Sequence, residues 1–355
     1  MDDQNQRRLP GTAVLMGGGI VAAWLGKRLL QKPSEDDLTG EIALITGASS
    51  GLGYLLAREF AREGCKLAIC ARYEDELLVA RDSLAREGVD VLAVPCDVGD
   101  QEQVDSLTRH VTAHYGQVDI LVNNAGVIQF GPVQSMRKED FEQSMDIMFW
   151  GTVHPTLAVL PQMKSRSAGR IVNITSVGGK VSVPHLVPYN SAKFAALGFS
   201  EGMHSELKQY GITVTTIVPG LMRTGSFVNA EFKGEVEKEY TWFSLGSSLP
   251  VITIDAQRAA RQIVESTKRG EAERILSIPA NILARINGIA PATTSRILGV
   301  VERYLLPNSP GVQDGAVAGR DVQEQLDSDV HEAVTALGQQ AAEEFQPPGK
   351  RPDES

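Results

Sequence analysis

Short apolar runs alternate with segments of helical spacing through most of the chain. The runs EIALIT, CKLAICA, DVLAVPCD, VDILVNNAG, GRIVNITS and ITVTTIVPG begin at residues 41, 65, 90, 118, 169 and 212. Helical segments lie between them, near 54–63, 74–87, 100–115, 138–166 and 189–209. Strands that are apolar throughout and are joined by helices indicate a parallel sheet covered on both faces. The pattern therefore predicts an α/β fold with a doubly wound parallel sheet.

The chain after residue 225 is less regular. Residues 255–270 have helical spacing, and ERILSIP from residue 273 reads as a last strand. Residues 281–306 are apolar apart from three arginines and one glutamate. We therefore expect a main domain over 41–306, preceded by a segment and linker over 1–40 and followed by a tail over 307–355. Within the tail, apolar residues recur every three or four positions from Val322 to Phe345, which predicts one amphipathic helix.

Residues 9–26 carry no charge and lie between Arg7–Arg8 and Lys27–Arg28. Eighteen uncharged residues reach the lower limit for a membrane-spanning helix, so a membrane anchor is one interpretation. A buried or loosely ordered N-terminal helix is the other, because five glycines weaken any helix. A secretory signal is less favoured, since no clear cleavage site follows.

Composition narrows the functional classes. The net charge of −10 resides mostly in the tail, where ten acidic and three basic residues follow Asn308. No basic block suggests nucleic-acid binding. The three cysteines form no Cys-x-x-Cys pair, which argues against a disulfide framework or a zinc site and favours a reducing, cytoplasmic compartment. We expect no metal site.

The first apolar run ends in TGASSGLG, residues 46–53, directly before a helical segment. Glycines at 47, 51 and 53 let the backbone turn tightly and approach a pyrophosphate. The following helix N-terminus offers free N–H groups and the positive end of a dipole. This turn therefore predicts a dinucleotide-binding site.

Tyr189 and Lys193 form a second candidate site, four residues apart in VPYNSAKFAALGF. At roughly 4 Å and an effective dielectric of about 20, the ammonium attracts a phenolate by about 4 kcal/mol. The spacing thus predicts that the pKa of Tyr189 falls from about 10 toward 7, where proton transfer is practicable. A buried core tyrosine beside a surface lysine is the alternative.

These motifs together resemble the short-chain dehydrogenase/reductase family. TGASSGLG, NNAG at 123–126, Ser176, YNSAK at 189–193 and PGLMRT at 219–224 occur in the family's order. The similarity extends from about residue 41 to 280. It implies a Rossmann-type fold, a nicotinamide cofactor, and an oxidoreductase that transfers hydride between a carbonyl and an alcohol.

The resemblance also implies roles for individual residues. Tyr189 is expected to act as acid and base, Ser176 to steady the substrate oxygen, and Lys193 to bond the nicotinamide ribose. Asn123 resembles the residue that stabilises the central strand. Besides Tyr189 and Lys193, the expected cofactor-binding residues are Gly47, Ser49, Ser50, Gly51, Leu52, Gly53, Arg72, Asp97, Val98, Asn124, Ala125, Gly126, Pro219, Gly220 and Thr224.

One position departs from the family's pattern. Where the family has an Asn that holds a water in a proton relay, the register places Met148. A thioether donates no hydrogen bond and accepts only weakly. We expect an active enzyme with slower proton exchange; the alternative is a cofactor-binding regulatory or scaffold protein with impaired turnover.

Arg72 bears on the choice of cofactor. The second apolar run ends in LAICAR without the acidic residue that holds the ribose 2′-hydroxyl of NAD. Arg72 can instead pair with the 2′-phosphate of NADP, which is therefore favoured. Stacking of Arg72 on the adenine without selection is the alternative.

Aromatic residues follow the proline-glycine turn at 219–220, namely Phe227, Phe232, Tyr240, Trp242 and Phe243. With the apolar segment VSVPHLVP before Tyr189, they predict a hydrophobic pocket for a lipophilic ketone, aldehyde or alcohol. Packing in the core or a lid is the alternative. The apolar segments 9–26 and 281–306 make a membrane-dissolved substrate attractive.

The expected partners beyond the substrate are few. The resemblance implies a homo-oligomer that pairs through the helices carrying Met148 and Tyr189. A membrane-tethered interaction protein that uses the tail helix is a further alternative.

Overall fold

The computed structural model describes residues 37–248, 253–308, 311 and 315–325. Its main sheet has seven parallel strands in the order β11-β7-β6-β4-β1-β2-β3. Their bounds are β1 (Ile42–Thr46), β2 (Lys66–Ala71), β3 (Val91–Pro95), β4 (Ile120–Asn123), β6 (Gly169–Ile174), β7 (Ile212–Val218) and β11 (Glu273–Ile275). The predicted parallel sheet is confirmed, strand for strand.

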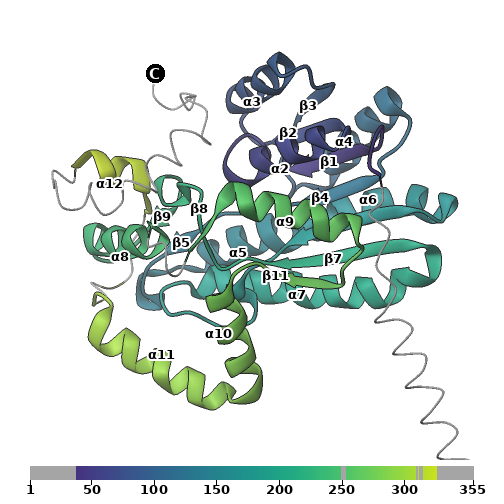
Figure 1. Ribbon diagram of the computed structural model, residues 1–355. Coiled ribbons are helices and arrows are strands. Elements are labelled where there is room, and N and C mark those ends of the chain that lie inside the picture. Colours follow the sequence, from purple (N-terminus) through teal and green to yellow (C-terminus); the bar gives the residue numbers. More distant parts are fainter. Residues whose placement is uncertain (1–36, 249–252, 309–310, 312–314, 326–355) are drawn as a thin grey trace, which may run out of the picture. The chain divides into compact units, whose positions relative to one another are not determined.

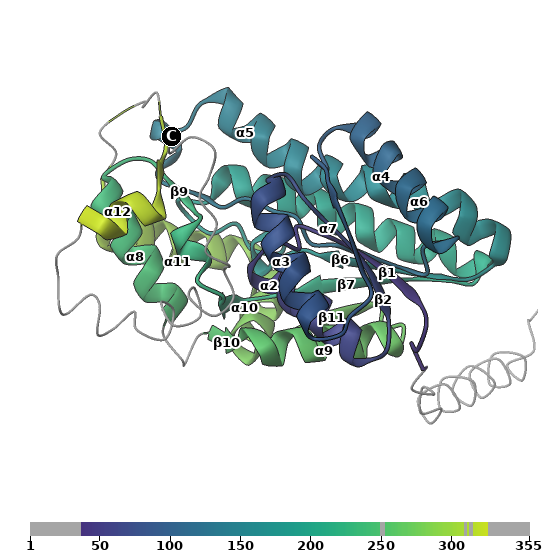
Figure 2. The same cartoon turned by 90° about the horizontal axis from the view of Figure 1, so that it is seen from above.

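Helices cover both faces of this sheet (Figure 1 and Figure 2). One layer holds α2 (Gly51–Arg62), α3 (Glu74–Arg86) and α9 (Ala256–Lys268). The other holds α4 (Gln101–Tyr115), α6 (Gly151–Arg166) and α7 (Val187–Leu207). The fold is therefore a doubly wound, Rossmann-type sheet in one main domain.

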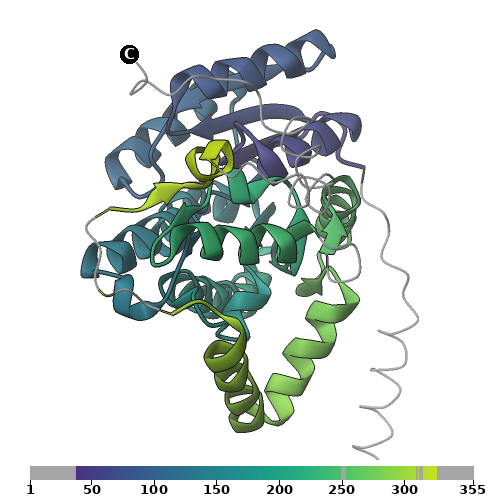
Figure 3. The same cartoon turned by 90° about the vertical axis from the view of Figure 1, so that its left-hand side faces the viewer.

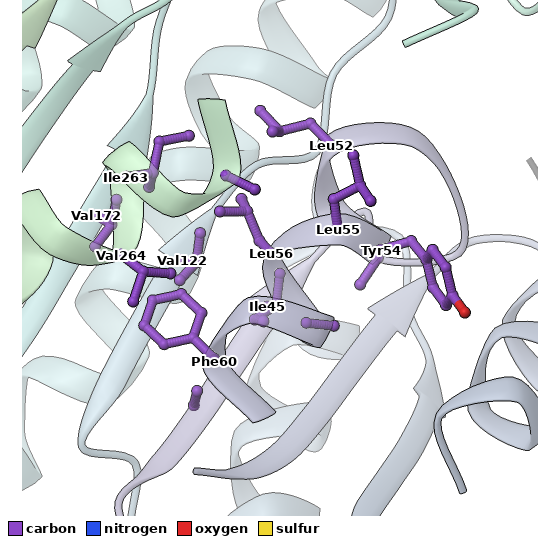
Figure 4. Close-up of a cluster of buried hydrophobic side chains, with 14 of the residues drawn as sticks. Ile45, Leu52, Tyr54, Leu55, Leu56, Phe60, Val122, Val172, Ile263 and Val264 are labelled. Atoms are coloured by element: carbon purple, nitrogen blue, oxygen red, sulfur yellow. The ribbon is translucent and has the colours of Figure 1, made fainter. Parts of the chain in front are cut away.

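The core lies on both sides of the central strands, which explains why the runs are apolar throughout. Alternate residues of β1 enter different clusters: Ala43 and Ile45 pack under α2 and α9, whereas Ile42 and Leu44 pack under α4 and α6. Figure 4 shows the first cluster, in which Phe60 of α2 lies beside residues of α9. The three cysteines, Cys65, Cys70 and Cys96, are buried and form no disulfide.

The strand order reverses between β1 and β4. From β1 the chain proceeds to β2 and β3 in one direction, and from β4 to β6, β7 and β11 in the other. Loops that leave the carboxyl ends of β1 and β4 diverge, and such a switch point opens a crevice for ligands. The glycine-rich turn and the NNAG segment follow these two strands.

The helical segment predicted over 138–166 is divided in the structure. It consists of α5 (Lys138–Met145), a π-helical turn η2 (Asp146–Trp150) and α6. Met148 lies in the π-helical turn and is 1% exposed. Single π-turns inside helices are frequent at functional sites.

Smaller elements cover the carboxyl edge of the sheet (Figure 3). One small sheet has the strand order β12 (Val317–Ala318), β9 (Glu231–Phe232) and β5 (Gln129–Phe130). A second consists of β10 (Thr253–Asp255) and β8 (Leu221–Arg223). The helices here are α8 (Val236–Ser248), α10 (Ile278–Ile289), α11 (Pro291–Leu305) and α12 (Gly319–Gln325). Short helical turns are η1 (Val133–Ser135), η3 (Val177–Gly179), η4 (Lys208–Tyr210) and η5 (Ser226–Val228).

Part of the predicted tail packs against this region. Val322 of α12 is 1% exposed and lies among aromatic residues, and β12 pairs with β9. The packed body thus includes residues beyond the predicted end at residue 306. The rest of the predicted tail stripe, from Leu326 to Phe345, and the apolar segment 9–26 lie outside the described residues.

Within the described part of the chain, no helix has both the length and the apolar character that crossing a bilayer requires.

Candidate active site

A cavity of about 620 Å³ lies at the carboxyl ends of the central strands. All eighteen residues that the sequence predicted as catalytic or cofactor-binding line it, from Gly47 and Arg72 to Ser176, Tyr189 and Thr224. Residues separated by most of the domain's length therefore meet in one place, as the resemblance implied.

The glycine-rich turn is shaped by close backbone contacts. A Cβ atom on Gly53 would lie 2.1 Å from the carbonyl oxygen of Gly47, and one on Gly47 would lie 2.8 Å from Cα of Ala125. Gly47 has a φ of +63°, in the left-handed region that favours glycine. The turn thus requires glycine at both positions, and the backbone itself forms this wall of the cavity.

The N-terminus of α2 suits an anionic ligand. Its N-cap residue, Ser50, makes no side-chain capping bond, and the first turn contains no acidic residue. Ser50, Gly51 and Leu52 all line the cavity. Free N–H groups and the helix dipole there match a pyrophosphate, so the turn fits a dinucleotide cofactor.

Asn124 ties the turn to the neighbouring strand. Its side-chain amide donates to the carbonyl oxygens of Thr46 and Gly47, each at 3.0 Å. Its backbone N–H donates to Oγ1 of Thr46 at 3.0 Å. The NNAG segment therefore fixes the turn at the switch point.

Ser176 and Tyr189 form the polar centre of the cavity. Ser176 lies two residues after β6 as the N-cap of η3, and it accepts the N–H of Gly178 at 3.0 Å, which orients its hydroxyl. Tyr189 lies in the first turn of α7 and is partly buried. Both side chains line the cavity, so a carbonyl oxygen placed between their hydroxyl groups would meet two donors.

Lys193 follows one turn later on α7 and is 5% exposed. Its Nζ donates to the carbonyl oxygen of Ile174 at 2.9 Å. Burial lowers the pKa of Lys193 to about 8. An ammonium has three donor hydrogens, so this bond leaves capacity for a ligand in the cavity that Lys193 also lines.

The predicted lowering of the Tyr189 pKa by Lys193 is wrong for this arrangement. Burial raises the pKa of Tyr189, and the hydrogen bond with Ser176 opposes that rise only in part. Nζ of Lys193 lies 5.8 Å from the ring centroid and is directed to Ile174 instead. The phenol therefore stays protonated at neutral pH, which is the form that donates a proton to a carbonyl oxygen undergoing reduction.

Met148 lies close to Tyr189 without entering the cavity wall. Its side chain belongs to a small apolar cluster with Ile147 and Ala192, against which Tyr189 packs. Its carbonyl oxygen accepts the hydroxyl of Thr152 at 2.8 Å. An apolar contact thus stands where the family has a polar amide.

The cavity wall at the end of β2 contains a basic and an acidic residue. Arg72 is exposed and lies over the ring of Tyr73, with 5.4 Å between the guanidinium carbon and the ring centroid. Glu76, in the first turn of α3, accepts a long hydrogen bond of 3.5 Å from Ser49 and lines the same cavity. Glu76 was not among the predicted residues; the only signal for it in the sequence is an acid four residues after Arg72.

The predicted aromatic pocket is largely a core. Of the five aromatic residues only Phe243 lines the cavity. Phe227, Phe232 and Tyr240 are buried in a cluster with Val322, and Trp242 is exposed, because α8 turns one side inward to the small sheet. The apolar lining comes instead from Val127, Ile128, Val183, Leu186, Leu221, Met222, Phe243, Pro279 and Leu283.

A buried hydrogen-bonded pair joins the loop before α7 to α8. Nδ1 of His185 lies 2.8 Å from Oε2 of Glu239, and these side chains are 3% and 0% exposed. His185 has a φ of +62°, so the backbone adopts a costly conformation that the surrounding contacts hold. Burial raises the pKa of Glu239, against the opposing effect of His185.

A second buried pair joins α5 to the residue after β9. Nζ of Lys233 donates to Oδ2 of Asp140 at 2.8 Å, and both side chains are at most 10% exposed. Neither pair could be predicted from the sequence, because no local spacing connects residues so far apart in the chain.

Comparison with known proteins identifies the family. The model of the short chain dehydrogenase family matches residues 41–233, and the chain belongs to this family. It is 33% identical over 255 residues to the oxidoreductase SadH of Mycobacterium tuberculosis, covering 70% of this chain and 91% of that protein. It is 30% identical over 271 residues to the 3-ketodihydrosphingosine reductase of Bos taurus, covering 75% and 80%.

Solved structures agree. A short-chain dehydrogenase from Streptomyces avermitilis matches with a TM-score of 0.64 and 31% identity, over 74% of this chain and 98% of that one. A gluconate 5-dehydrogenase from Burkholderia cenocepacia, in complex with NADP and tartrate, matches with a TM-score of 0.61 and 25% identity, over 70% and 99%. The protein is thus an NAD(P)-dependent oxidoreductase acting on alcohols or carbonyls.

Proposed function

We propose that the protein interconverts a lipophilic carbonyl compound and its alcohol with NADP(H), and that Tyr189 is the acid and base. The observation that carries the proposal is the grouping of Ser176, Tyr189 and Lys193 in the cavity that also holds the glycine-rich turn. The bound cofactor supplies or accepts the hydride. Tyr189 donates a proton to the carbonyl oxygen, Ser176 holds that oxygen, and Lys193 orients the cofactor.

The first experiment follows NADPH absorbance with a panel of lipophilic ketones and aldehydes. Tyr189→Phe should lower turnover at least about a hundredfold, the lower size of a general acid contribution. Tyr210→Phe is the matched control, because Tyr210 contacts Lys164 and does not line the cavity. Equal turnover in the wild type and Tyr189→Phe would contradict the role of Tyr189.

In this proposal Arg72, which is exposed and lines the cavity directly after β2, selects NADP over NAD. Its guanidinium can pair with the 2′-phosphate, whereas the nearby carboxylate of Glu76 would favour a ribose hydroxyl. We expect Arg72→Gln to weaken NADPH binding at least about tenfold and to leave NADH binding unchanged, since a charged hydrogen bond contributes about 1.5 to 3 kcal/mol. Glu76→Gln, measured by the same titration, should instead increase the preference for NADPH over NADH.

The apolar lining supports a lipophilic substrate, as does the similarity to the bovine 3-ketodihydrosphingosine reductase. Each methylene buried in such a lining should raise kcat/KM about fourfold, which corresponds to about 0.8 kcal/mol. A series of straight-chain ketones measures this slope, and Phe243→Ala should flatten it. A flat series together with turnover of polyols would refute the lipophilic assignment.

A homo-oligomer remains part of the proposal. Three large apolar side chains on the helices that carry or follow Met148 and Tyr189 are exposed: Trp150 at 43%, Leu157 at 49% and Phe194 at 42%. Sedimentation velocity should show a dimer or tetramer that Leu157→Glu dissociates. A cytoplasmic location and an anchor at residues 9–26 also stay predictions, which cell fractionation of the full chain would check.

A protein that binds cofactor with impaired turnover is the second candidate, and Met148 is the observation that favours it. Its distinguishing outcome is NADPH binding without turnover of any compound in the panel.

A further inference from the structure

The outer side of α10 is unusually apolar. Four isoleucines recur at intervals of four, four and three residues, which places them along one stripe. They are between 49% and 86% exposed: Ile278, Ile282, Ile286 and Ile289. A surface helix normally exposes its polar face, so this stripe is reversed relative to the expectation.

The next helix, α11, continues the apolar surface. Ile297, Val300 and Tyr304 follow one another at three and four residues and are 57%, 57% and 70% exposed. Arg296 and Arg303 are adjacent to this stripe and are exposed. α10 contributes the exposed Arg285, so the two helices combine apolar stripes with three cations and one exposed acid, Glu302.

The α10–α11 hairpin, residues 278–305, stands out from the body (Figure 1 and Figure 3), and hydrogen bonds are made near both ends of α10. Ser277 caps α10 by accepting the N–H of Ala280, and the side-chain amide of Asn287 donates to the carbonyl oxygen of Lys180 at 2.8 Å. The inner side of α10 faces the active-site cavity through Pro279, Ala280 and Leu283. One helix therefore separates the cavity from the exposed isoleucine stripe.

The concentration of exposed apolar residues is specific to this hairpin. Of the fourteen large hydrophobic side chains exposed in the described part of the chain, eight lie within residues 278–305. Single exposed hydrophobic residues are ordinary, but a contiguous patch on two neighbouring helices marks an interaction surface.

We propose that the α10–α11 hairpin docks on the surface of a bilayer that contains anionic lipids, lying in the interface without spanning it. Helices of this kind bury an apolar stripe at the boundary of headgroups and acyl chains, with arginines reaching the headgroups. Arg285, Arg296 and Arg303 supply charge complementary to anionic lipid. A second copy on this face is less suitable, because a two-fold interface would bring three arginines of each copy together with one glutamate each.

The docked orientation bears on the reaction. The cavity wall formed by Pro279 and Leu283 would face the membrane through the thickness of α10, so an apolar substrate would have a short path from lipid to Tyr189. This consequence rests on the proposed lipophilic substrate, whereas docking itself does not depend on it.

The test measures co-sedimentation of the full chain with phosphatidylcholine vesicles, with and without phosphatidylserine. All chains carry Leu15→Glu and Val21→Glu, which remove any contribution from the predicted apolar segment 9–26. In that background Ile282→Glu with Val300→Glu should lower the partition coefficient at least about tenfold. Ala85→Glu with Ala113→Glu adds the same charge at exposed sites of α3 and α4 and should leave it unchanged.

Substitution of the arginines provides a second part of the same experiment. Arg296→Gln with Arg303→Gln should lower partition at least about threefold on anionic vesicles and have no effect on pure phosphatidylcholine. Arg86→Gln with Arg109→Gln, exposed on α3 and α4, is the matched control. Circular dichroism checks that each variant is folded.

Two outcomes overturn the proposal. One is equal partition of the parent and the hairpin variants, including no partition of either. The other is an oligomer that the hairpin substitutions dissociate in the absence of vesicles, which would make a second copy the occupant. Turnover of a short, water-soluble ketone without vesicles is measured in parallel, so that loss of the proposed activity is distinguished from loss of docking.

Discussion

The two sides of the cavity are held in place by different kinds of interaction. On the cofactor side, close backbone contacts between Gly47, Gly53 and Ala125 set the shape, with the amide of Asn124 as a brace. On the lid side, formed by the loop 181–186 and α8, a buried hydrogen-bonded pair, His185 and Glu239, connects the segments. Backbone groups are the same whatever the side chains, so the cofactor side can bind a dinucleotide in the same way in many sequences. Side chains on the lid side can be substituted, so that side can be adapted to a particular substrate.

The largest loss of stability is expected on the lid side, when the His185–Glu239 pair is broken. We expect His185→Ala to lower the free energy of unfolding by about 3 to 5 kcal/mol, because Glu239 would remain buried without a partner. Since burial already raises the pKa of Glu239, the loss should be smallest near pH 4, where the carboxyl is protonated, and should grow as pH rises. Urea unfolding across pH measures it.

Two controls sharpen this result. His204→Ala should cost only about 1 kcal/mol, because that histidine bonds a backbone carbonyl at 2.7 Å and leaves no charge buried. Glu239→Gln added to His185→Ala should recover part of the stability. A loss independent of pH, with no recovery, would show that the pair is not what joins the loop to α8.

Substitution of Lys193 should stabilise the fold instead, since this residue is a buried cation that lines the cavity. Its pKa is about 8 in the folded protein, below the ordinary value of 10.5, so the folded state disfavours its proton at neutral pH. We expect Lys193→Met to raise the free energy of unfolding by about 2 to 3 kcal/mol at pH 7 while abolishing turnover. The gain should disappear as pH rises from about 8 to 10.5, where unfolded lysine also deprotonates.

Lys180→Met is the control for this experiment. Lys180 lies 2.6 Å from Glu273, and its pKa is raised despite partial burial, so its removal should reduce stability at pH 7. A Lys193→Met variant that is less stable than the wild type at pH 7 would contradict the assignment of a buried, destabilising charge.

The cofactor side should be sensitive to one added methyl group. Gly53→Ala places Cβ against the carbonyl oxygen of Gly47, and the backbone must move. We expect a loss of about 1 to 3 kcal/mol and a weaker affinity for NADPH, measured by fluorescence titration. Gly202→Ala on α7 has open space and should be neutral or stabilising. Unchanged NADPH affinity in Gly53→Ala would mean that the turn does not shape the cofactor site.

Met148→Asn should have the smallest effect on stability, about 1 to 2 kcal/mol lost through burial of an amide among Ile147 and Ala192. If the wild type is a competent enzyme, turnover should change little. A rise of about a hundredfold, the size of a general acid–base contribution, would favour the protein with impaired turnover instead.

The sequence was sufficient for the cofactor side and insufficient for the lid side. Strands buried on both faces are apolar throughout, and a glycine-rich turn between strand and helix is a local pattern, so both could be recognised from residue spacing. The partners His185 and Glu239 are 54 residues apart, and Lys233 and Asp140 are 93 apart. No local periodicity connects such residues, and only the folded chain shows that they meet.

The errors have similar causes. Aromatic spacing after residue 225 predicted a pocket, but an aromatic residue near a ligand site and one in an adjacent core have the same local sequence, and Phe232 belongs to the core. The pKa of Tyr189 was argued from the charge of Lys193 alone; burial, which depends on the surrounding elements, has the larger effect.

The three buried cysteines have a practical consequence. Burial raises the pKa of Cys65 to about 12, and the hydrogen bond with Cys96 together with burial raises that of Cys70. Alkylating reagents attack the thiolate, so neither group reacts readily while the fold is closed. Cys70 lies in β2 and Cys65 directly before it, in the cofactor half of the domain. The rate at which an alkylating reagent labels them therefore measures how often that half alone opens.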